Sequence, residues 1–162
     1  MIAVLQRVYS ATVFADGELS GKIDRGPYIL LGVEGTDTET DADLLVEKIS
    51  KLRIFSDENG KMNLSVNDIG GDALVVSNFT LNANYAHGNR PDYLSGAPAE
   101  EANRLYEYFL SGIRTKIPKV ESGKFGADMR SELSTDGPVT IVMNSKVLYK
   151  KKKAKLLRGF NR

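Results

Sequence analysis

Two short segments, far apart in this chain of 162 residues, carry the groups best suited to chemistry. Residues 77–81 (Ser-Asn-Phe-Thr-Leu) supply two hydroxyls, those of Ser77 and Thr80, directly after an apolar run. Residues 136–140 (Asp-Gly-Pro-Val-Thr) place a Gly-Pro step at the start of a β-rich run. A hydroxyl can attack or position a substrate, and a glycine allows bare backbone to approach a ligand closely.

The two hydroxyls lack the partner that an activated nucleophile needs. A serine or threonine attacks when a base lies within hydrogen-bond reach, and the only histidine, His87, belongs to a long polar loop. Alternation along a strand would also put Ser77 and Thr80 on opposite faces unless the chain turns there. From the residues alone, a Ser-His-Asp triad stays open, but an ordinary strand end is the plainer interpretation.

The Gly137–Pro138 step also has two interpretations. It can be a simple turn before a strand, since proline is tolerated at the first strand position. Alternatively its peptide bond can be cis, an uncommon isomer that marks a deliberate feature. Two backbone carbonyls could then face a ligand, and such a rigid wall could distinguish the two hands of a chiral centre.

The composition is that of one soluble globular domain, with 41% hydrophobic and 27% charged residues. The absence of cysteine excludes disulfides, thiolate chemistry and Cys-rich zinc sites. Acidic residues at Asp41, Asp43 and Glu47 are expected on the solvated face of a helix rather than around a metal. The sequence implies no metal and no cofactor. No signal peptide or membrane-spanning run is present, so we expect a cytoplasmic protein.

Charge is distributed unevenly along the chain, although the net charge is only +1. Residues 146–162 contain eight basic residues and no acidic one, which leaves 14 basic against 21 acidic residues in positions 1–145. This tail either contacts the phosphates of a nucleic acid or is a frayed, solvated terminus.

Hydrophobic periodicity predicts a single α/β domain with a mixed β-sheet and two main helices. Amphipathic helices are expected from Glu39 to Leu52 and from Pro98 to about Ile113. A hairpin turn is expected at Asp16-Gly17. One strand is predicted to open at residues 3–8 and to continue through residues 11–15, and further strands are predicted at residues 28–33, 73–79, 129–134 and 139–143.

Taken together, these segments resemble the D-aminoacyl-tRNA deacylases. Members of this family are homodimeric editing enzymes that hydrolyse the ester between a D-amino acid and tRNA. The resemblance runs from Ile2 to about Ser145, so it implies a deacylase domain at 1–145 followed by a basic tail at 146–162. Besides the two segments above, it includes residues 6–8, 52–55, 60–66 and 125–129.

The resemblance also implies roles for individual residues. Ser77, Phe79 and Thr80 match the catalytic signature, in which Asn78 replaces the usual glutamine and is one methylene shorter. The family relies mainly on backbone donors and on the 2′-hydroxyl of the tRNA, which agrees with the missing base here.

The second signature concerns substrate binding and the dimer. Gly137 and Pro138 match a cis step that crosses into the partner's active site, captures the D-aminoacyl group and excludes L-amino acids, and Arg7 matches its supporting arginine. Thr135 stands where asparagine is usual. The segment that lines the pocket for the terminal adenosine of the tRNA is matched by Phe125, Gly126, Ala127 and Met129.

The expected function is therefore hydrolysis of D-aminoacyl-tRNA, with clearance of glycyl-tRNA mischarged on tRNA(Ala) as a second activity because glycine lacks a side chain. Two alternatives stay open. One is a related editing enzyme with a trans Gly-Pro step that accepts a small L-amino acid. The other is a non-catalytic tRNA-binding module that uses the basic tail.

Overall fold

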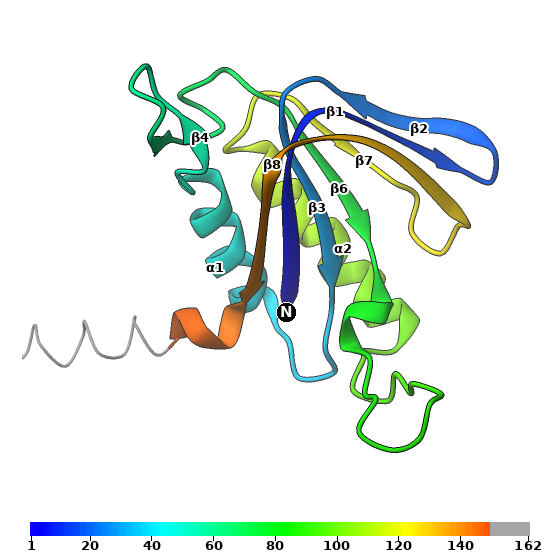
Figure 1. Ribbon diagram of the computed structural model, residues 1–162. Helices are drawn as coiled ribbons and strands as arrows, with labels where there is room; N and C mark the ends of the chain where they lie inside the picture. The colour runs from blue at the N-terminus through cyan, green and yellow to red at the C-terminus, as the bar shows by residue number, and fades with distance from the viewer. Residues whose placement is uncertain (150–162) are drawn as a thin grey trace, which may run out of the picture.

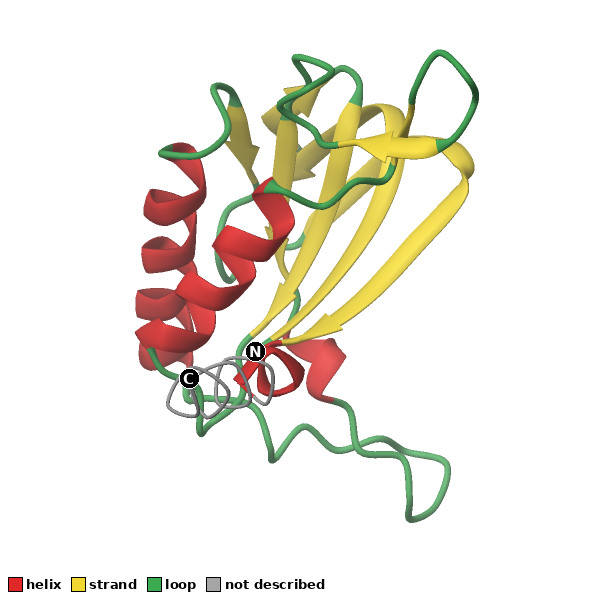
Figure 2. Ribbon diagram, turned by 90° about the vertical axis from the view of Figure 1, so that its left-hand side faces the viewer, coloured by secondary structure: helices red, strands yellow, loops and turns green. Residues whose placement is uncertain are grey.

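A curved mixed β-sheet, with two helices on one face, forms the part of the chain that the computed structural model describes, residues 1–149 (Figures 1 and 2). The sheet strands are β1 (Ile2–Ala15), β2 (Glu18–Ile23), β3 (Gly26–Gly32), β6 (Ala73–Ser77), β7 (Val120–Ser122) and β8 (Met129–Asn144). The helices are α1 (Glu39–Ser50), α2 (Ala99–Arg114) and the 3₁₀ turn η1 (Phe79–Asn82). A small separate hairpin joins β4 (Phe55–Ser56) to β5 (Met62–Leu64).

The long strand β1 organises the sheet because it pairs along both of its edges. One edge pairs antiparallel with β8 over almost the whole length of both strands. The other edge pairs first with β3 and then with β2. β6 and β7 extend the sheet in parallel register beyond β3, so the sheet is mixed, as the sequence predicts.

The sheet curls until the two ends of its strand order, β2 and β7, come together. The hydroxyl of Ser20 in β2 donates to the carbonyl of Ser122 in β7 at 3.0 Å. Gly21 allows this close approach, because a Cβ there would lie 3.1 Å from the Ser122 carbonyl oxygen. The smaller of two apolar clusters fills the concave side of the curled sheet. It contains Val8, Ala11, Val13, Ile23, Tyr28, Leu74 and Val76.

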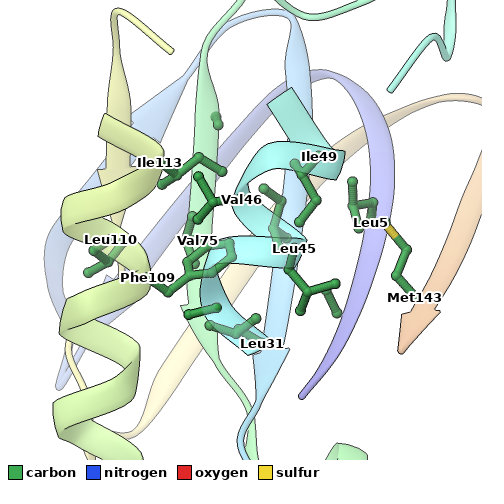
Figure 3. Packing of buried hydrophobic residues seen from close by; sticks show 14 of the residues in the cluster. Leu5, Leu31, Leu45, Val46, Ile49, Val75, Phe109, Leu110, Ile113 and Met143 are labelled. Carbon is green, nitrogen blue, oxygen red and sulfur yellow. The ribbon is translucent and has the colours of Figure 1, made fainter. Parts of the chain in front are cut away.

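The main hydrophobic core lies between the sheet and the two helices (Figure 3). From α1, Leu45 and Ile49 face the sheet, and from α2, Phe109 and Ile113 do the same. The two positions in each pair are four residues apart, which is the spacing of one helix face. The tyrosine Tyr106 is also buried there, and its hydroxyl donates to the Val75 carbonyl at 3.0 Å.

Most predicted elements are present, with informative differences. The Asp16-Gly17 turn is confirmed, and both residues have positive φ. The two predicted C-terminal strands are one strand, β8, whose register shifts in the middle. The strand predicted at 73–79 ends at Ser77, and the three-residue strand β7 has no sequence signal of its own.

Asp41 corrects one expectation, because it is buried rather than on the solvated face of α1. Its carboxylate accepts hydrogen bonds from the hydroxyls of Ser145, at 2.6 Å, and Tyr149, at 3.3 Å. It also completes the capping box with Thr38 at the start of α1. Asp41 therefore joins the beginning of α1 to the helical residues 145–149 that follow β8.

The basic tail predicted from Lys146 lies mostly outside the described residues. Lys146 itself pairs with Glu34 at 2.8 Å. The division into a domain at 1–145 and a tail stays a prediction. Within residues 1–149, no helix is long and apolar enough to span a membrane.

Replacing Asp41 by asparagine should lower stability in a pH-dependent way. Burial alone would raise the pKa of Asp41, but hydrogen bonds from Ser145 and Thr38 outweigh it and hold the pKa below its usual value. The carboxylate therefore stabilises the fold above the ordinary carboxyl pKa, and this contribution is lost as the pH falls. We expect Asp41→Asn to lower the free energy of unfolding by about 2 kcal/mol at neutral pH, measured by urea denaturation.

The matched control is Asp43→Asn, on the exposed side of the same helix turn. We expect a change within about 0.5 kcal/mol there. Equal losses for the two variants, or a loss at Asp41 that persists undiminished in acid, would contradict this account.

Candidate active site

The chain turns sharply at the end of β6, and this turn brings the hydroxyls of Ser77 and Thr80 to one pocket. Asn78 is the N-cap of η1, and its side-chain oxygen accepts from the backbone N–H of Thr80 at 3.1 Å. The same oxygen accepts from the Thr80 hydroxyl. Strand alternation, which would have separated the two hydroxyls, therefore stops at Ser77.

This pocket has a volume of about 670 Å³. It unites the first signature segment with the segment predicted to line an adenosine site. Strand residues, the base of the loop after η1 and the start of α2 complete it. The predicted residues in its lining are Ser77, Asn78, Phe79, Thr80, Phe125, Gly126, Ala127 and Met129.

The wall formed by residues 125–129 is held by the β1–β2 hairpin. The backbone N–H of Asp16 donates to the Asp128 carbonyl at 2.9 Å, and the Asp128 N–H donates to the Asp16 carboxylate at 3.1 Å. Gly126 has φ +77°, a conformation that favours glycine. Phe125 is packed against the buried ring of Tyr106, with ring centroids 5.9 Å apart. The wall is thus fixed from both sides.

Two pocket hydroxyls that sequence reasoning missed belong to Tyr28 and Ser131. They form a hydrogen bond of 2.7 Å, and both residues line the pocket. Burial raises the pKa of Tyr28, so this phenol remains protonated at neutral pH. No local motif marks the pair, because Tyr28 and Ser131 pair with different parts of β1, opposite Gln6 and Val13, and meet only in the folded, curled sheet.

The site contains no activated side-chain nucleophile. Within residues 1–149, neither Ser77 nor Thr80 donates to a histidine or a carboxylate. His87 is exposed in the loop after η1 and does not line the pocket. No group of three or more His, Cys, Asp or Glu side chains in that range is arranged to hold a metal ion.

Backbone donors are present instead. The first N–H groups of a helix have no acceptor inside the helix, and one of them, that of Thr80, is taken by Asn78. The N–H of Phe79 has no acceptor among residues 1–149. It lies at the pocket between the two hydroxyl-bearing residues, where it can donate to a ligand oxygen.

Arg7, Gly137 and Pro138 lie together, but they do not line this pocket. In the β1–β8 pairing, Gln6 faces Thr140 and Val8 faces Thr135, so residues 136–139 form a bulge opposite Arg7. The Gly137–Pro138 bond is cis, and both residues are exposed.

A buried ion pair supports the bulge. The Arg7 Nη2 donates to the Asp136 carboxylate at 3.0 Å, and its Nε donates to the Asp136 carbonyl at 3.3 Å. Its Nη1 donates to the Ile54 carbonyl at 2.6 Å. Both charged residues are less than 10% exposed. Sequence reasoning missed Asp136, although it directly precedes the Gly-Pro step and is the anion that a buried arginine requires.

Glycine is required at position 137 for two reasons. Its φ is +131°, which other residues rarely adopt. A Cβ added there would also lie 2.7 Å from the backbone nitrogen of Val139. The conformation of the bulge therefore depends on this residue as well as on Arg7.

Comparison with known proteins identifies the class. A family model for D-Tyr-tRNA(Tyr) deacylase matches residues 4–144. The D-aminoacyl-tRNA deacylase of Thermosipho melanesiensis is 52% identical over 92% of this chain and 100% of its own length. That of Pelobacter propionicus is 51% identical over 88% of this chain and 99% of its own.

Solved structures agree with the fold. A c-Myc DNA unwinding element binding protein has a TM-score of 0.84 and 41% identity, over 89% of this chain and 98% of its own. A probable eukaryotic D-amino acid tRNA deacylase has a TM-score of 0.77 at 15% identity, over 88% of this chain and 98% of its own, and shows the fold alone.

These relatives place the chain among hydrolases that act on ester bonds. It belongs to the D-aminoacyl-tRNA deacylase family, and the predicted family, fold class and enzyme class are confirmed. Deacylation of D-aminoacyl-tRNA is the activity that this membership supports.

Removing the Asn78 cap should impair both the local structure and the activity. Asn78→Ala deletes the acceptor for Thr80, which should cost about 1 kcal/mol of stability. Because η1 then positions Phe79 and Thr80 less well, we expect kcat for a D-aminoacyl-tRNA to fall about ten-fold. Asn78→Asp keeps the acceptor oxygen and should lose much less. Thermal unfolding and steady-state kinetics test this expectation, and equal kcat losses in both variants would rule out the capping explanation.

Proposed function

We propose that this protein is a chiral editing enzyme that hydrolyses D-aminoacyl-tRNA, spares L-aminoacyl-tRNA and works as a homodimer. The proposal rests on the finding that the two signature segments, residues 77–80 and Gly137–Pro138, do not line the same pocket of one protomer. The hydroxyls and the free N–H of Phe79 lie at the pocket, whereas the Gly-Pro bulge is exposed outside it. A complete site then needs the bulge of a second copy.

The 670 Å³ pocket is of the right size for the terminal adenosine of the tRNA. In this arrangement the wall at Phe125–Met129 holds the nucleoside, and the ester carbonyl lies near the start of η1. Water attacks the carbonyl carbon, the ester C–O bond breaks, and the ribose oxygen leaves with a proton. The products are the free D-amino acid and tRNA.

Backbone donation supplies the catalytic effect in this proposal. The N–H of Phe79 stabilises the oxyanion that develops on the carbonyl oxygen, and the hydroxyls of Ser77 and Thr80 orient the substrate. An ester is already an activated acyl group, so orientation and oxyanion stabilisation can supply much of the acceleration. The 2′-hydroxyl of the terminal ribose is positioned to assist the proton transfer.

The dimer is supported by the exposed edge of β8. Among the described strands, β8 pairs only with β1, which leaves its second edge open over a long strand. Val142 on this strand is 71% exposed. An open, partly apolar edge favours pairing with another chain. Gly137 and Pro138 lie on the same strand, so a dimer through β8 carries both bulges into the interface.

Chirality follows from a rigid backbone wall. Carbonyl groups of the partner's bulge would accept from the ammonium group of the substrate, and the Cα hydrogen of a D-amino acid would face the wall. The side chain of an L-amino acid would clash there. Glycine has no side chain, so glycyl-tRNA mischarged on tRNA(Ala) is included as a second substrate.

Matched D- and L-tyrosyl-tRNA test the function directly. We expect hydrolysis of the D-ester to be at least about a hundred-fold faster in kcat/KM, because the wall excludes the L side chain. Glycyl-tRNA should be cleared at enzyme concentrations that clear the D-ester. Comparable rates for the D- and L-esters would contradict exclusion of the L side chain by the wall. Binding of tRNA without turnover would indicate a non-catalytic module.

Subunit complementation tests the shared site. Thr80→Ala disables the pocket, and Gly137→Ala disables the bulge because its positive φ and its Cβ contact forbid alanine. Purified heterodimers of the two variants should recover about half of the wild-type activity, because one of two sites is intact if the bulge acts in the partner. Each homodimer should be inactive. Gly60→Ala is the control, since Gly60 also has positive φ but has open space around it. Inactive heterodimers would place both signatures in one protomer.

A further inference from the structure

A projecting loop beside the pocket has no role in the core or in the proposed chemistry. Residues 83–95, here called the arm, extend away from the body beyond η1 (Figures 1 and 2). The sequence predicts only a long polar loop there. The arm contributes no residue to the buried hydrophobic core.

The base of the arm is firmly attached. The N–H of Gly35 donates to the Ser95 carbonyl at 2.9 Å, and the N–H of Ala97 donates to the Val33 carbonyl at 3.0 Å. The Ser95 hydroxyl donates to the Asn82 carbonyl at 3.0 Å. The two ends of the arm are therefore fixed next to the pocket.

The arm itself has a defined shape. Asn84 and Asp92 form a pair of backbone hydrogen bonds, at 2.8 and 2.9 Å, and the Asn84 amide donates to the Asp92 carboxylate at 3.0 Å. Their side-chain oxygens also accept from the N–H groups of Ala86 and Leu94. A segment fixed by these hydrogen bonds is a pre-organised surface and not a flexible linker.

Apolar side chains lead from the pocket mouth onto this surface. The ring of Phe79 contacts that of Tyr93 edge-to-face, with centroids 5.1 Å apart, and both residues line the pocket. Leu94, which follows Tyr93 in the chain, is 91% exposed, and Tyr85, which follows the bridged residue Asn84, is 80% exposed. Side chains of this size, exposed together beside a site, mark a surface that binds something.

We infer that the arm binds the single-stranded nucleotides that directly precede the terminal adenosine of the substrate tRNA. This inference rests on the proposed function, because it takes the adenosine to occupy the pocket. The nucleotides before it must leave through the pocket mouth, where Phe79 and Tyr93 lie. Aromatic rings stack on any base, so the arm binds single-stranded nucleotides whatever their base sequence.

The charge of the arm agrees with a polyanionic ligand. Its basic residues, His87 and Arg90, lie near the tip at Gly88, and its one acidic side chain, Asp92, is occupied by Asn84. The rest of positions 1–145 carries an excess of acidic residues. The arm thus offers stacking surface and a local cation beside the pocket of an otherwise acidic body.

The test compares two substrates that share the reacting ester. One is D-tyrosyl-tRNA, and the other is 2′(3′)-O-D-tyrosyl-adenosine, which has the terminal nucleoside and no preceding nucleotides. The double variant Tyr85→Ala/Leu94→Ala should lower kcat/KM for the tRNA about ten-fold or more and leave that for the adenosine ester within two-fold. The effect on the tRNA should appear mainly in KM.

A matched control is Met62→Ala, in β5 of the small β4–β5 hairpin at the opposite end of the molecule (Figure 1). Met62 is 58% exposed, and its variant should hydrolyse both substrates like the wild type. Sedimentation of each variant reports whether the oligomeric state has changed.

The outcomes separate the two proposals. If the wild type hydrolyses neither ester, the proposed function is wrong and the arm proposal falls with it. If the wild type is active and the arm variant loses both substrates equally, or loses neither, the arm proposal alone is wrong. A shift in oligomeric state confined to the arm variant would instead make the arm a contact between copies and would also overturn the proposal.

Discussion

The buried guanidinium of Arg7 stabilises the bulge at residues 136–139 of β8. Where four residues of β8 face one residue of β1, the ladder of backbone hydrogen bonds is interrupted. Arg7 replaces it with bonds to the carbonyl and the carboxylate of Asp136 and to the carbonyl of Ile54. Lysine could not make these contacts together, because it lacks the planar fork of a guanidinium. The same interaction neutralises the buried carboxylate of Asp136, which also lies 3.7 Å from the more exposed guanidinium of Arg25.

The other functional region depends on a different constraint, the early end of β6. One more strand residue would have sent the chain on in extended form and separated Ser77 from Thr80. The cap formed by Asn78 instead starts η1, and the Phe79 N–H has no acceptor among residues 1–149. Asparagine is well suited to this task, since its short side chain reaches the N–H two residues later. Asn78, whose side chain is one methylene shorter than the glutamine usual in the family, therefore caps η1.

Much of the fold could be predicted from the sequence. The two helices follow from apolar spacing, and the hairpin at Asp16-Gly17 follows from turn chemistry. The pocket residues at 77–80 and 125–129 were identified by resemblance to a family, and only the structure shows that they share one pocket. Asp41 was misassigned because a polar residue on a helix gives no sign of a distant chain segment covering it. Tyr28, Ser131 and Asp136 were missed for a related reason, since their partners lie in strands far away in the sequence.

The pairing of β1 with β8 affects the order in which parts of the fold can form. Ile2 pairs with Asn144, so the first strand to be synthesised pairs along one edge with the last strand of residues 1–149. That edge of β1 cannot be covered until nearly the whole described chain has been made, and contacts over such sequence distances form slowly. Because the Gly-Pro bulge exists only where β8 lies against Arg7, it is among the last features to form. A nascent chain can therefore assemble the η1 turn well before it has the bulge.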